Sequence, residues 1–443
     1  MYDPLVNNYP GPAQPHVRSY WQATTSVDLP ATQKYLPEHA DIVVIGAGYT
    51  GLNAALELAQ RFQQQVVVID ANQIGWGCST RNAGFAMPGT GRLGYGDWEK
   101  RLGVDGTRAI KAEYDHAFER LERHLQACPQ RLQAQRGGYL KIAHRPQAID
   151  ALKASYAILK RYEPGTRWLD ADAIQKRVHS PQAHAAIHYP QSFGINPVLL
   201  AASLARQAQQ AGVTLVEDAP VQRWDKVAQQ HRLHTAKGRI CAPKVVIASN
   251  GYTPNHLHPG IHGRSLPVLS SVIVTRPLTA DEKAATGLHS TELVMDTRTL
   301  KYYYRLLPDG RLLFGGRGAI RGKDAQHPRY AKHLLAALQG TFPALRQLSS
   351  EPVEYYWSGW ISVALDNYPR IYSPDDGIYT AMGYCGAGVT FTQLAGQRLA
   401  ELAMGEQLPA LPFYQGPLPR FPLPHLRRVG QWAFYQLARW RTF

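Results

Sequence analysis

The sequence is poor in cysteine and in long hydrophobic runs, and each absence narrows the class of protein. Among 443 residues there are four cysteines, Cys78, Cys128, Cys241 and Cys385. They are too few and too widely spaced for a disulfide framework, and none forms the Cys-x-x-Cys pair of a structural zinc site. We therefore expect a reduced, cytoplasmic protein.

Apolar segments of membrane-spanning length are missing as well. The apolar runs are short and flanked by charge, and none approaches the roughly 20 residues of a transmembrane helix. Residues 1–21 are polar and interrupted by proline, without the apolar core of a secretory signal. We expect neither a transmembrane segment nor export.

Acidic residues are outnumbered by basic ones. The chain has 48 Lys and Arg against 33 Asp and Glu, a formal net charge of +15. Such an excess suits nucleic acid, a membrane surface or an anionic substrate. Apart from the last residues the charge is dispersed, so we interpret it as a solvated surface and expect no nucleic-acid partner.

The regular pattern begins with a strand–helix–strand unit. An apolar run, 41–45, precedes Gly46-Ala47-Gly48-Tyr49-Thr50-Gly51, a segment with helical periodicity follows, and a second apolar run ends at Asp70. Glycines at this turn let the backbone approach a pyrophosphate, and the helix start offers N–H groups to phosphates. Because Asp70 can accept hydrogen bonds from a ribose, the unit predicts dinucleotide binding.

The rest of the chain alternates helices and strands. Residues 95–185 read as helices interrupted by a strand at 139–143, and 190–220 as loop, helix and strand. Further strands are expected at 244–250 and 271–278, and a hairpin at 301–316 turns at Pro308-Asp309-Gly310. A strand near 380 then leads into a helix through Met404, and a final helix follows a proline-rich stretch.

Four motifs in order carry a resemblance to a known family. They are the unit ending at Asp70, GWG-x-S-x-RN-x-G (75–84), ASNGYT (248–253) and GYCGAGV (383–389). Over nearly the whole chain they resemble the FAD-dependent D-amino-acid oxidase superfamily. With SYWQATT (19–25), the chain is similar to the branch that contains γ-glutamylputrescine oxidase and bacterial L-pipecolate oxidase.

The resemblance implies an α/β fold of two interleaved parts. A Rossmann-like FAD-binding domain would comprise 38–94, 190–252 and 355–407. A substrate domain on a mainly antiparallel sheet would comprise 95–189 and 253–354. The arm 1–37 would lie on the surface. Residues 408–443, a proline-rich tail and C-terminal helix, would pack on the FAD domain.

The resemblance also implies non-covalent FAD and a set of residues around it. The glycine turn and the loop after Asp70 would lie along the pyrophosphate and flavin, Val221 beside the adenine, and 386–390 beneath the pyrimidine ring. The full set is Gly46, Ala47, Gly48, Tyr49, Thr50, Gly51, Asp70, Ala71, Ser79, Thr80, Arg81, Asn82, Val221, Gly386, Ala387, Gly388, Val389 and Thr390.

Departures from the family pattern bear on the chemistry. Cys385 and Ala387 stand where Ser and His are frequent, and Thr390 stands where the sarcosine-oxidase branch has a carboxylate-binding lysine. The stretch 360–369 has no cysteine for a covalent flavin link, so Cys385 is expected to pack. A sarcosine-like carboxylate clamp is therefore not expected.

The implied reaction is oxidation of the C–N bond of a small amine or amino acid. Hydride would pass to flavin N5, an imine would form, and O2 or another acceptor would take the electrons. The alternatives are a flavin-dependent hydroxylase, a dehydrogenase feeding a respiratory acceptor, an NAD-dependent dehydrogenase, and a non-enzymatic basic protein that binds nucleic acid or a membrane and leaves the four motifs unused. The flavin itself would carry the chemistry, and no side chain is assigned a catalytic role.

Four residues are candidates for the substrate pocket: Tyr303, Arg305, Arg317 and Trp360. Strand alternation places Tyr303 and Arg305 on one face, and in the resembling family such a strand roofs the substrate cavity. Arg305 or Arg317 is expected to bind a substrate carboxylate. The alternatives are aromatic packing for Tyr303 and Trp360, and a loop acid as the partner of Arg317.

Two further patterns remain. His256, His258 and His262 lie close in sequence, but no carboxylate or cysteine pattern supports a metal site, and we expect none. In the final helix an apolar stripe contains Leu426, Val429, Ala433, Leu437 and Trp440. Such a basic amphipathic helix either lies on a membrane or packs its stripe on the FAD domain, and we expect packing.

Overall fold

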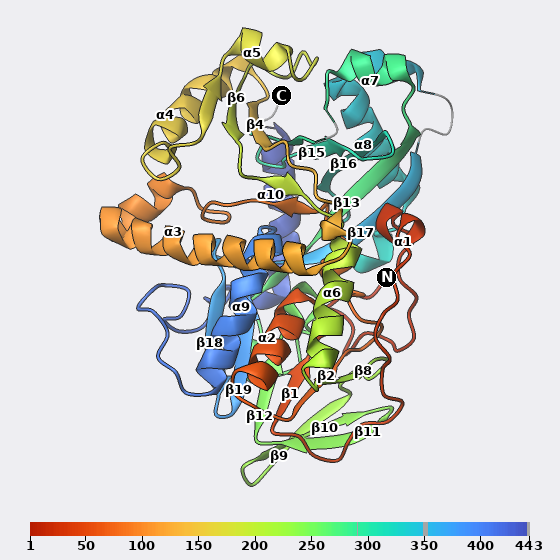
Figure 1. Ribbon diagram of the computed structural model, residues 1–443, viewed down its shortest axis with the longest axis vertical. Coiled ribbons are helices and arrows are strands. Elements are labelled where there is room, and N and C mark those ends of the chain that lie inside the picture. The colour runs from red at the N-terminus through yellow and green to blue at the C-terminus, as the bar shows by residue number, and fades with distance from the viewer. Residues whose placement is uncertain (290, 349–352, 441–443) are drawn as a thin grey trace.

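The computed structural model describes residues 1–289, 291–348 and 353–440. Figure 1 shows two sheets one above the other, with the long helix α3 (Tyr95–Ala127) crossing between them. Gly103 interrupts α3 with a φ of +69°. Within the described residues, every helix is too short or too polar to cross a lipid bilayer.

The lower sheet in Figure 1 has six strands in the order β18-β19-β12-β1-β2-β8. Five of them run parallel, and β18 is antiparallel to β19. Every residue of β1 and β2 is buried, as expected of strands covered on both faces. The bounds are β1 Ile42–Ile45, β2 Val66–Ile69, β8 Thr214–Val216, β12 Lys244–Ile247, β18 Arg370–Asp375 and β19 Ile378–Met382.

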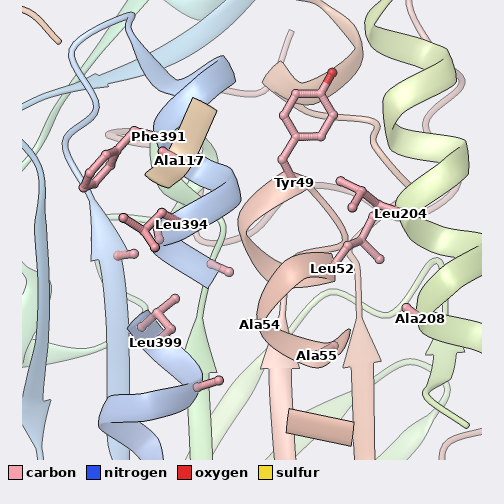
Figure 2. Close-up of a cluster of buried hydrophobic side chains, with 14 of the residues drawn as sticks. Tyr49, Leu52, Ala54, Ala55, Ala117, Leu204, Ala208, Phe391, Leu394 and Leu399 are labelled. Atoms are coloured by element: carbon pink, nitrogen blue, oxygen red, sulfur yellow. The ribbon is translucent and has the colours of Figure 1, made fainter. Parts of the chain in front are cut away.

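Helices cover one face of this sheet. Figure 2 shows α2 (Tyr49–Gln60) between α6 (Pro197–Gln210) and α9 (Gly388–Ala403), with their apolar side chains turned inward. Gly396 permits the close approach of α9, because a Cβ there would lie 2.4 Å from the Cβ of Asn53. The opposite face is covered by β9 (Arg223–Val227), β10 (Gln230–Thr235) and β11 (Gly238–Ala242).

The upper sheet has eight strands in the order β17-β13-β16-β15-β14-β4-β6-β5. Its neighbours pair antiparallel except β14 and β4. Helix α8 (Pro328–Thr341) packs Leu334 and Leu338 on one face. The bounds are β4 Tyr139–Ala143, β5 Arg167–Leu169, β6 Ala185–Tyr189, β13 Leu266–Pro277, β14 Leu293–Asp296, β15 Tyr303–Leu306, β16 Arg311–Arg317 and β17 Val353–Val363.

Smaller elements complete the two parts. Strands β3 and β7 form a short two-stranded ribbon. Helices α4, α5 and α7 lie around the rim of the upper sheet (Figure 1). Their bounds are β3 Phe85–Ala86, β7 Phe193–Gly194, α4 Ile149–Leu159, α5 Ala171–Gln175 and α7 Ala280–Thr286.

The sequence-based expectations for the central elements are confirmed. The first strand–helix–strand unit is β1, α2 and β2, the hairpin at 301–316 is β15 and β16, and the strand before the late glycine motif continues into α9. An α/β fold with a parallel and a mainly antiparallel sheet follows, as expected. The hairpin turns where predicted, with Gly310 at a φ of +80°.

Three segments differ from expectation. Strand β17 pairs with β13 along its length, so 353–363 belongs to the upper sheet rather than starting the lower part at 355. The strands β9–β11 were not predicted. The N-terminal arm contains helix α1 (Tyr20–Thr24), and Tyr20 and Trp21 are buried in a core cluster with Val272 and Trp357.

The expectation for the C-terminal helix is wrong. Helix α10 (Arg427–Trp440) buries Arg427, Gln431, Tyr435 and Ala438, whereas the predicted apolar stripe is exposed. The buried side lies mainly against β13 and its surroundings, where Arg428 donates to the carbonyl of Pro267 over 2.7 Å. Helical spacing correctly groups the apolar residues, but the group faces away from the protein.

Candidate active site

A large cavity lies where the two sheets meet. Its walls come from the turn after β1, the loop after β2, the segment 76–92, the strands β13 and β16, and the start of α9. Of the residues expected to bind FAD, all but Ala47, Gly51 and Thr80 line this cavity. Segments far apart in sequence therefore converge on one site.

The glycine turn is shaped for close backbone approach. Gly46 has a φ of +113°, and a Cβ at Gly51 would lie 1.9 Å from the carbonyl oxygen of Gly46. A Cβ at Gly48 would lie 2.8 Å from Oγ of Ser79, which accepts a 3.0 Å hydrogen bond from the amide of Tyr49. Gly48 is also the N-cap of α2 and has no side chain of its own to cap the helix, so the helix start faces the cavity with the hydroxyl of Ser79 beside it.

Asp70 braces this turn from the end of β2. One carboxylate oxygen accepts the amide of Ala47 at 2.7 Å and the other accepts the amide of Asn72 at 3.0 Å. Burial raises the pKa of Asp70 to about 6, against the opposing effect of these two hydrogen bonds. The side chain lines the cavity close to Ala71 and Val221, so its remaining lone pairs are available to a ribose hydroxyl.

Arg81 brings an unsatisfied donor to the cavity wall. Its Nε donates to the carbonyl of Trp76 at 2.8 Å, and its guanidinium lies 4.5 Å from the centre of the Trp76 ring. Nη2 is buried and has no hydrogen-bond partner within the described residues. A buried cationic donor of this kind fits a phosphate or a flavin carbonyl. Beside it, Asn82 donates to the carbonyl of Ser79, and Thr80 turns inward to donate to the carbonyl of Gly75.

The loop before α9 closes the opposite wall. Cys385 and Gly386 have φ angles of +55° and +89°, so the backbone turns sharply before the helix begins. Burial raises the pKa of Cys385 to about 11, and its thiol donates to the carbonyl of Gly383. The thiol therefore stays protonated and packed. Thr390 donates to the carbonyl of Met87 at 2.9 Å, which joins α9 to the segment 76–92.

Tyr303 forms the roof from β15. Its hydroxyl lies 2.9 Å from Oγ of Ser270, and its ring meets Phe85 edge-on at 5.8 Å. The side chain lines the cavity, whereas Tyr304 on the other face packs in the core against Phe314. The strand alternation expected from the sequence is confirmed.

Three cations line the cavity near this roof: Arg92, Lys301 and Arg317. Within the described part of the chain, no acidic side chain forms an ion pair with any of them. Burial and the charges of Lys141 and Arg92 lower the pKa of Lys301 to about 7. Burial and Arg317 likewise lower the pKa of Arg92. This cluster suits an anionic group on a ligand.

Arg317 is among the residues predicted from the sequence to line the substrate pocket, whereas Arg92 and Lys301 are not. Arg92 follows a glycine-rich turn, and Lys301 immediately precedes the tyrosines of β15. Their positions beside these two motifs are the one sequence feature that could have pointed to them as cavity residues. It is weak, because the two residues are far apart in sequence and meet only in the folded chain.

Two other candidates for the substrate pocket lie in the packed interior. Arg305 is 1% exposed, donates to the carbonyl of Ile195 at 2.8 Å and stacks on Trp21. Trp360 is fully buried and donates to the carbonyl of Tyr2. Arg305 shares the strand face of Tyr303, but the ribbon of β3 and β7 covers that end of the strand. These two placements correct the sequence-based hypothesis.

The three histidines of the segment 256–262 do not share one centre. The rings of His256 and His262 lie tilted against each other with their centres 5.4 Å apart, whereas His258 faces Trp224 and Asp375. Among the described residues, no group of three or more His, Cys, Asp or Glu is arranged to hold a metal ion.

Comparison with known proteins gives one consistent family. The family model described as "FAD dependent oxidoreductase" (DAO) matches residues 41–402. The chain is 32% identical to gamma-glutamylputrescine oxidoreductase of Escherichia coli, covering 92% of this chain and 95% of the relative. It is 31% identical to the probable oxidoreductase OrdL of Haemophilus influenzae, covering 89% of each.

Solved structures show the same fold. Glycine oxidase of Geobacillus kaustophilus matches with a TM-score of 0.70 and 21% identity, over 86% of this chain and 99% of that one. L-proline dehydrogenase of P. horikoshii matches with a TM-score of 0.69 and 20% identity, over 85% and 96%.

Proposed function

Because the chain belongs to the FAD dependent oxidoreductase family, we propose that it oxidises the C–N bond of a small amine that also carries a carboxylate. The substrate is γ-glutamylputrescine-like or L-pipecolate-like rather than sarcosine-like. The observation that carries this proposal is the cluster of Arg92, Lys301 and Arg317 on the cavity wall beside Tyr303.

The chain's residues fit FAD on two structural grounds. Side chains larger than hydrogen at Gly46, Gly48 or Gly51 would collide with backbone or with Ser79, which keeps the turn open to a pyrophosphate. Nη2 of Arg81 supplies a buried donor that has no partner among residues 1–289, 291–348 and 353–440. When bound, FAD supplies a hydride acceptor for the carbon next to the substrate nitrogen.

The cations would hold the substrate's acidic end. A carboxylate in a partly dry cavity gains charge-assisted hydrogen bonds from arginine, and these are stronger there than on the surface. Thr390 carries no charge, so this position at the start of α9 offers no cation for a carboxylate. Its hydroxyl is also already hydrogen-bonded to the backbone of Met87. The acidic group would therefore be bound under β15 and β16.

Lys301 would serve the amine, while Arg92 and Arg317 hold the carboxylate. An amine with a free lone pair releases hydride from its neighbouring carbon far more readily than an ammonium group. With a pKa of about 7, Lys301 is partly neutral near pH 7 and can take up the proton that the substrate loses. Tyr303 and Phe85 would exclude water from the same space.

An anaerobic bleaching screen tests the proposal. The purified yellow protein would be mixed with γ-glutamylputrescine, L-pipecolate, proline, sarcosine or D-amino acids, and absorbance near the flavin maximum followed. We expect bleaching by one of the first three and not by sarcosine. Bleaching by NADPH without an amine would contradict the proposal and indicate a hydroxylase.

The same samples identify the electron acceptor. Admission of air returns the yellow colour rapidly in an oxidase. Recovery with a quinone but slow recovery in air indicates a dehydrogenase. The bleaching step itself does not depend on this second outcome.

A further inference from the structure

Helix α10 presents its apolar side to solvent. The side chains that it buries, Arg427, Gln431, Tyr435 and Ala438, follow one another at helical spacing and are mostly polar. The outer face of α10, which we define as Leu426, Val429, Trp432, Ala433, Leu437 and Trp440, is exposed throughout. An amphipathic helix that packs only on its own protein has the reverse arrangement.

The exposure of this face is large for its composition. Trp440 is 78% exposed, Val429 58% and Trp432 54%. Leu423, just before the helix, is 57% exposed and extends the patch. Single exposed apolar residues are ordinary, but a contiguous patch with two tryptophans marks an interaction surface.

Specific polar contacts fix the helix in this orientation. Arg427 donates to Oδ1 of Asn255 at 2.7 Å and also to the carbonyl of Ser265. Arg428 forms a 2.7 Å ion pair with Asp3, and its guanidinium lies 4.7 Å from the centre of the Trp360 ring. Rotation of α10 to bury the apolar face would break these contacts and leave Asp3 unpaired.

A basic groove runs along one side of α10. It lies between the helix and the residues that follow β16, and its walls include Arg317, Arg321, Arg329, His333, Arg428 and Arg439. Asp324 is the single acid among the described residues that line it, and it lies 3.6 Å from Arg321. Arg317, Arg329 and Arg439 form no ion pair within the described residues.

The sequence around the helix has the same sign of charge. Residues 407–443 contain five arginines and no aspartate or glutamate. A protein partner that covers an apolar face needs no such bias. An anionic lipid surface does, because its phosphates attract arginine while its acyl boundary accepts apolar side chains and tryptophan rings.

We propose that α10 docks this protein on the surface of an anionic membrane. The outer face of α10 enters the boundary between headgroups and acyl chains, parallel to the membrane plane. Arg321, Arg329 and Arg439 of the basic groove lie at the level of the lipid phosphates. This docking is a separate property from the proposed oxidation, since it uses neither the cavity nor FAD.

Vesicle flotation of the FAD-loaded full chain tests the proposal. We expect binding to vesicles of phosphatidylglycerol and phosphatidylcholine, weakened by high salt, and roughly tenfold less binding to phosphatidylcholine alone. The double variant Val429→Glu/Leu437→Glu should lose binding by roughly the same factor. The matched control is Val227→Glu on β9, which is 45% exposed on a distant part of the fold and should bind as the parent does.

Fluorescence gives an independent readout. Trp432 and Trp440 are exposed, whereas Trp21, Trp98, Trp357 and Trp360 are at most 2% exposed. Anionic vesicles should therefore shift the emission to the blue in the parent, and less in Trp432→Phe/Trp440→Phe. Unchanged FAD absorbance and Tm in each variant show that the fold is intact.

Three results would overturn the proposal. One is absence of binding to anionic vesicles at low salt. Another is binding that Val429→Glu/Leu437→Glu leaves unchanged. The third is a stable dimer in solution that the same double variant dissociates, since a second copy of the chain would then be the occupant of the outer face.

Discussion

Tyr303 lies flat against Gly315, its partner across the β15–β16 hairpin. A Cβ on Gly315 would fall 2.2 Å from the tyrosine ring, so the ring position depends on glycine at that point. The ring of Tyr303 reaches the cavity because Gly315 on β16 has no side chain in its way. A change in β16 that never touches the cavity should therefore alter the site.

Replacement Gly315→Ala tests this dependence. We expect the ring of Tyr303 to be displaced, the rate of anaerobic flavin reduction to fall by about tenfold or more, and the FAD content to remain as in the parent. Tyr303→Phe keeps the ring and should retain most of the rate. Equal rates in Gly315→Ala and the parent would show that the ring position is unimportant.

The second prediction concerns the cofactor. Gly48→Val should yield a colourless protein, because even a Cβ there meets Oγ of Ser79 at 2.8 Å and would stand in the path of a pyrophosphate. The ratio of flavin to protein absorbance measures the loss. The control is Gly430→Val on α10, where an added Cβ would meet no atom of the described chain within 4 Å, and its colour should be unchanged.

The cofactor is expected to leave on denaturation. Cys385 and Cys78 are protonated thiols with pKa values raised to about 11 by burial. Acid precipitation should therefore move all yellow colour into the supernatant. Colour that stays with the pellet would show a covalent link.

The third prediction concerns the carboxylate. Arg317→Met and Arg92→Met should each raise the KM for the acid substrate by about 10- to 100-fold, as expected for loss of charge-assisted hydrogen bonds in a partly dry cavity. FAD content should not change. The neutral amide of the same substrate should be affected much less, and Arg108→Met on the exposed side of α3 serves as the control.

The test also separates the two arginines. If both variants bind the acid substrate as the parent does, the carboxylate is held elsewhere in the cavity. If only Arg92→Met weakens binding of the acid substrate, Arg92 binds the carboxylate and Arg317 does not.

The fourth prediction concerns pH. Lys301, whose pKa burial lowers to about 7, is a cation below that pH and becomes a neutral proton acceptor above it. The rate of flavin reduction should therefore rise with pH through about 7. In Lys301→Met this step should disappear and leave the ionisation of the substrate amine at higher pH. Lys301→Arg, which stays charged, should remain slow across the range.

Stopped-flow reduction measured over pH distinguishes these profiles. A parent profile that is flat or falls toward alkaline pH would contradict the requirement for a neutral amine. Identical profiles in the parent and Lys301→Met would instead exclude Lys301 as the group that titrates.

Much of the fold and of the cofactor site could be predicted from short sequence patterns. The turn at 46–51, Asp70 and the hairpin at 301–316 each have a signal within a short window, because glycine, a strand end or a turn residue has a definite backbone requirement. The strands β9 to β11 were not predicted because their side chains are largely polar and only some of them are buried, so they form no apolar run.

Tertiary placement accounts for the rest. Periodicity grouped Val429, Leu437 and Trp440 correctly but could not show which way the group faces. Strand alternation correctly placed Arg305 on the same face of β15 as Tyr303. The ribbon of β3 and β7 nevertheless covers Arg305, whereas Tyr303 still lines the cavity. Such outcomes depend on segments more than 100 residues apart, for which a single sequence offers no direct signal.

Strand β17 has a mechanical consequence. It is the edge of the upper sheet, and Val363 at its end bridges to Tyr384, while the next amide, that of Ala364, donates to the sulfur of Cys385 in the loop before α9. Strand β17 thus connects the upper sheet, which forms the roof of the cavity, to the loop before α9, which forms its opposite wall. We expect no hinge that swings the two sheets apart, so small molecules must reach the cavity through the motion of side chains and short loops.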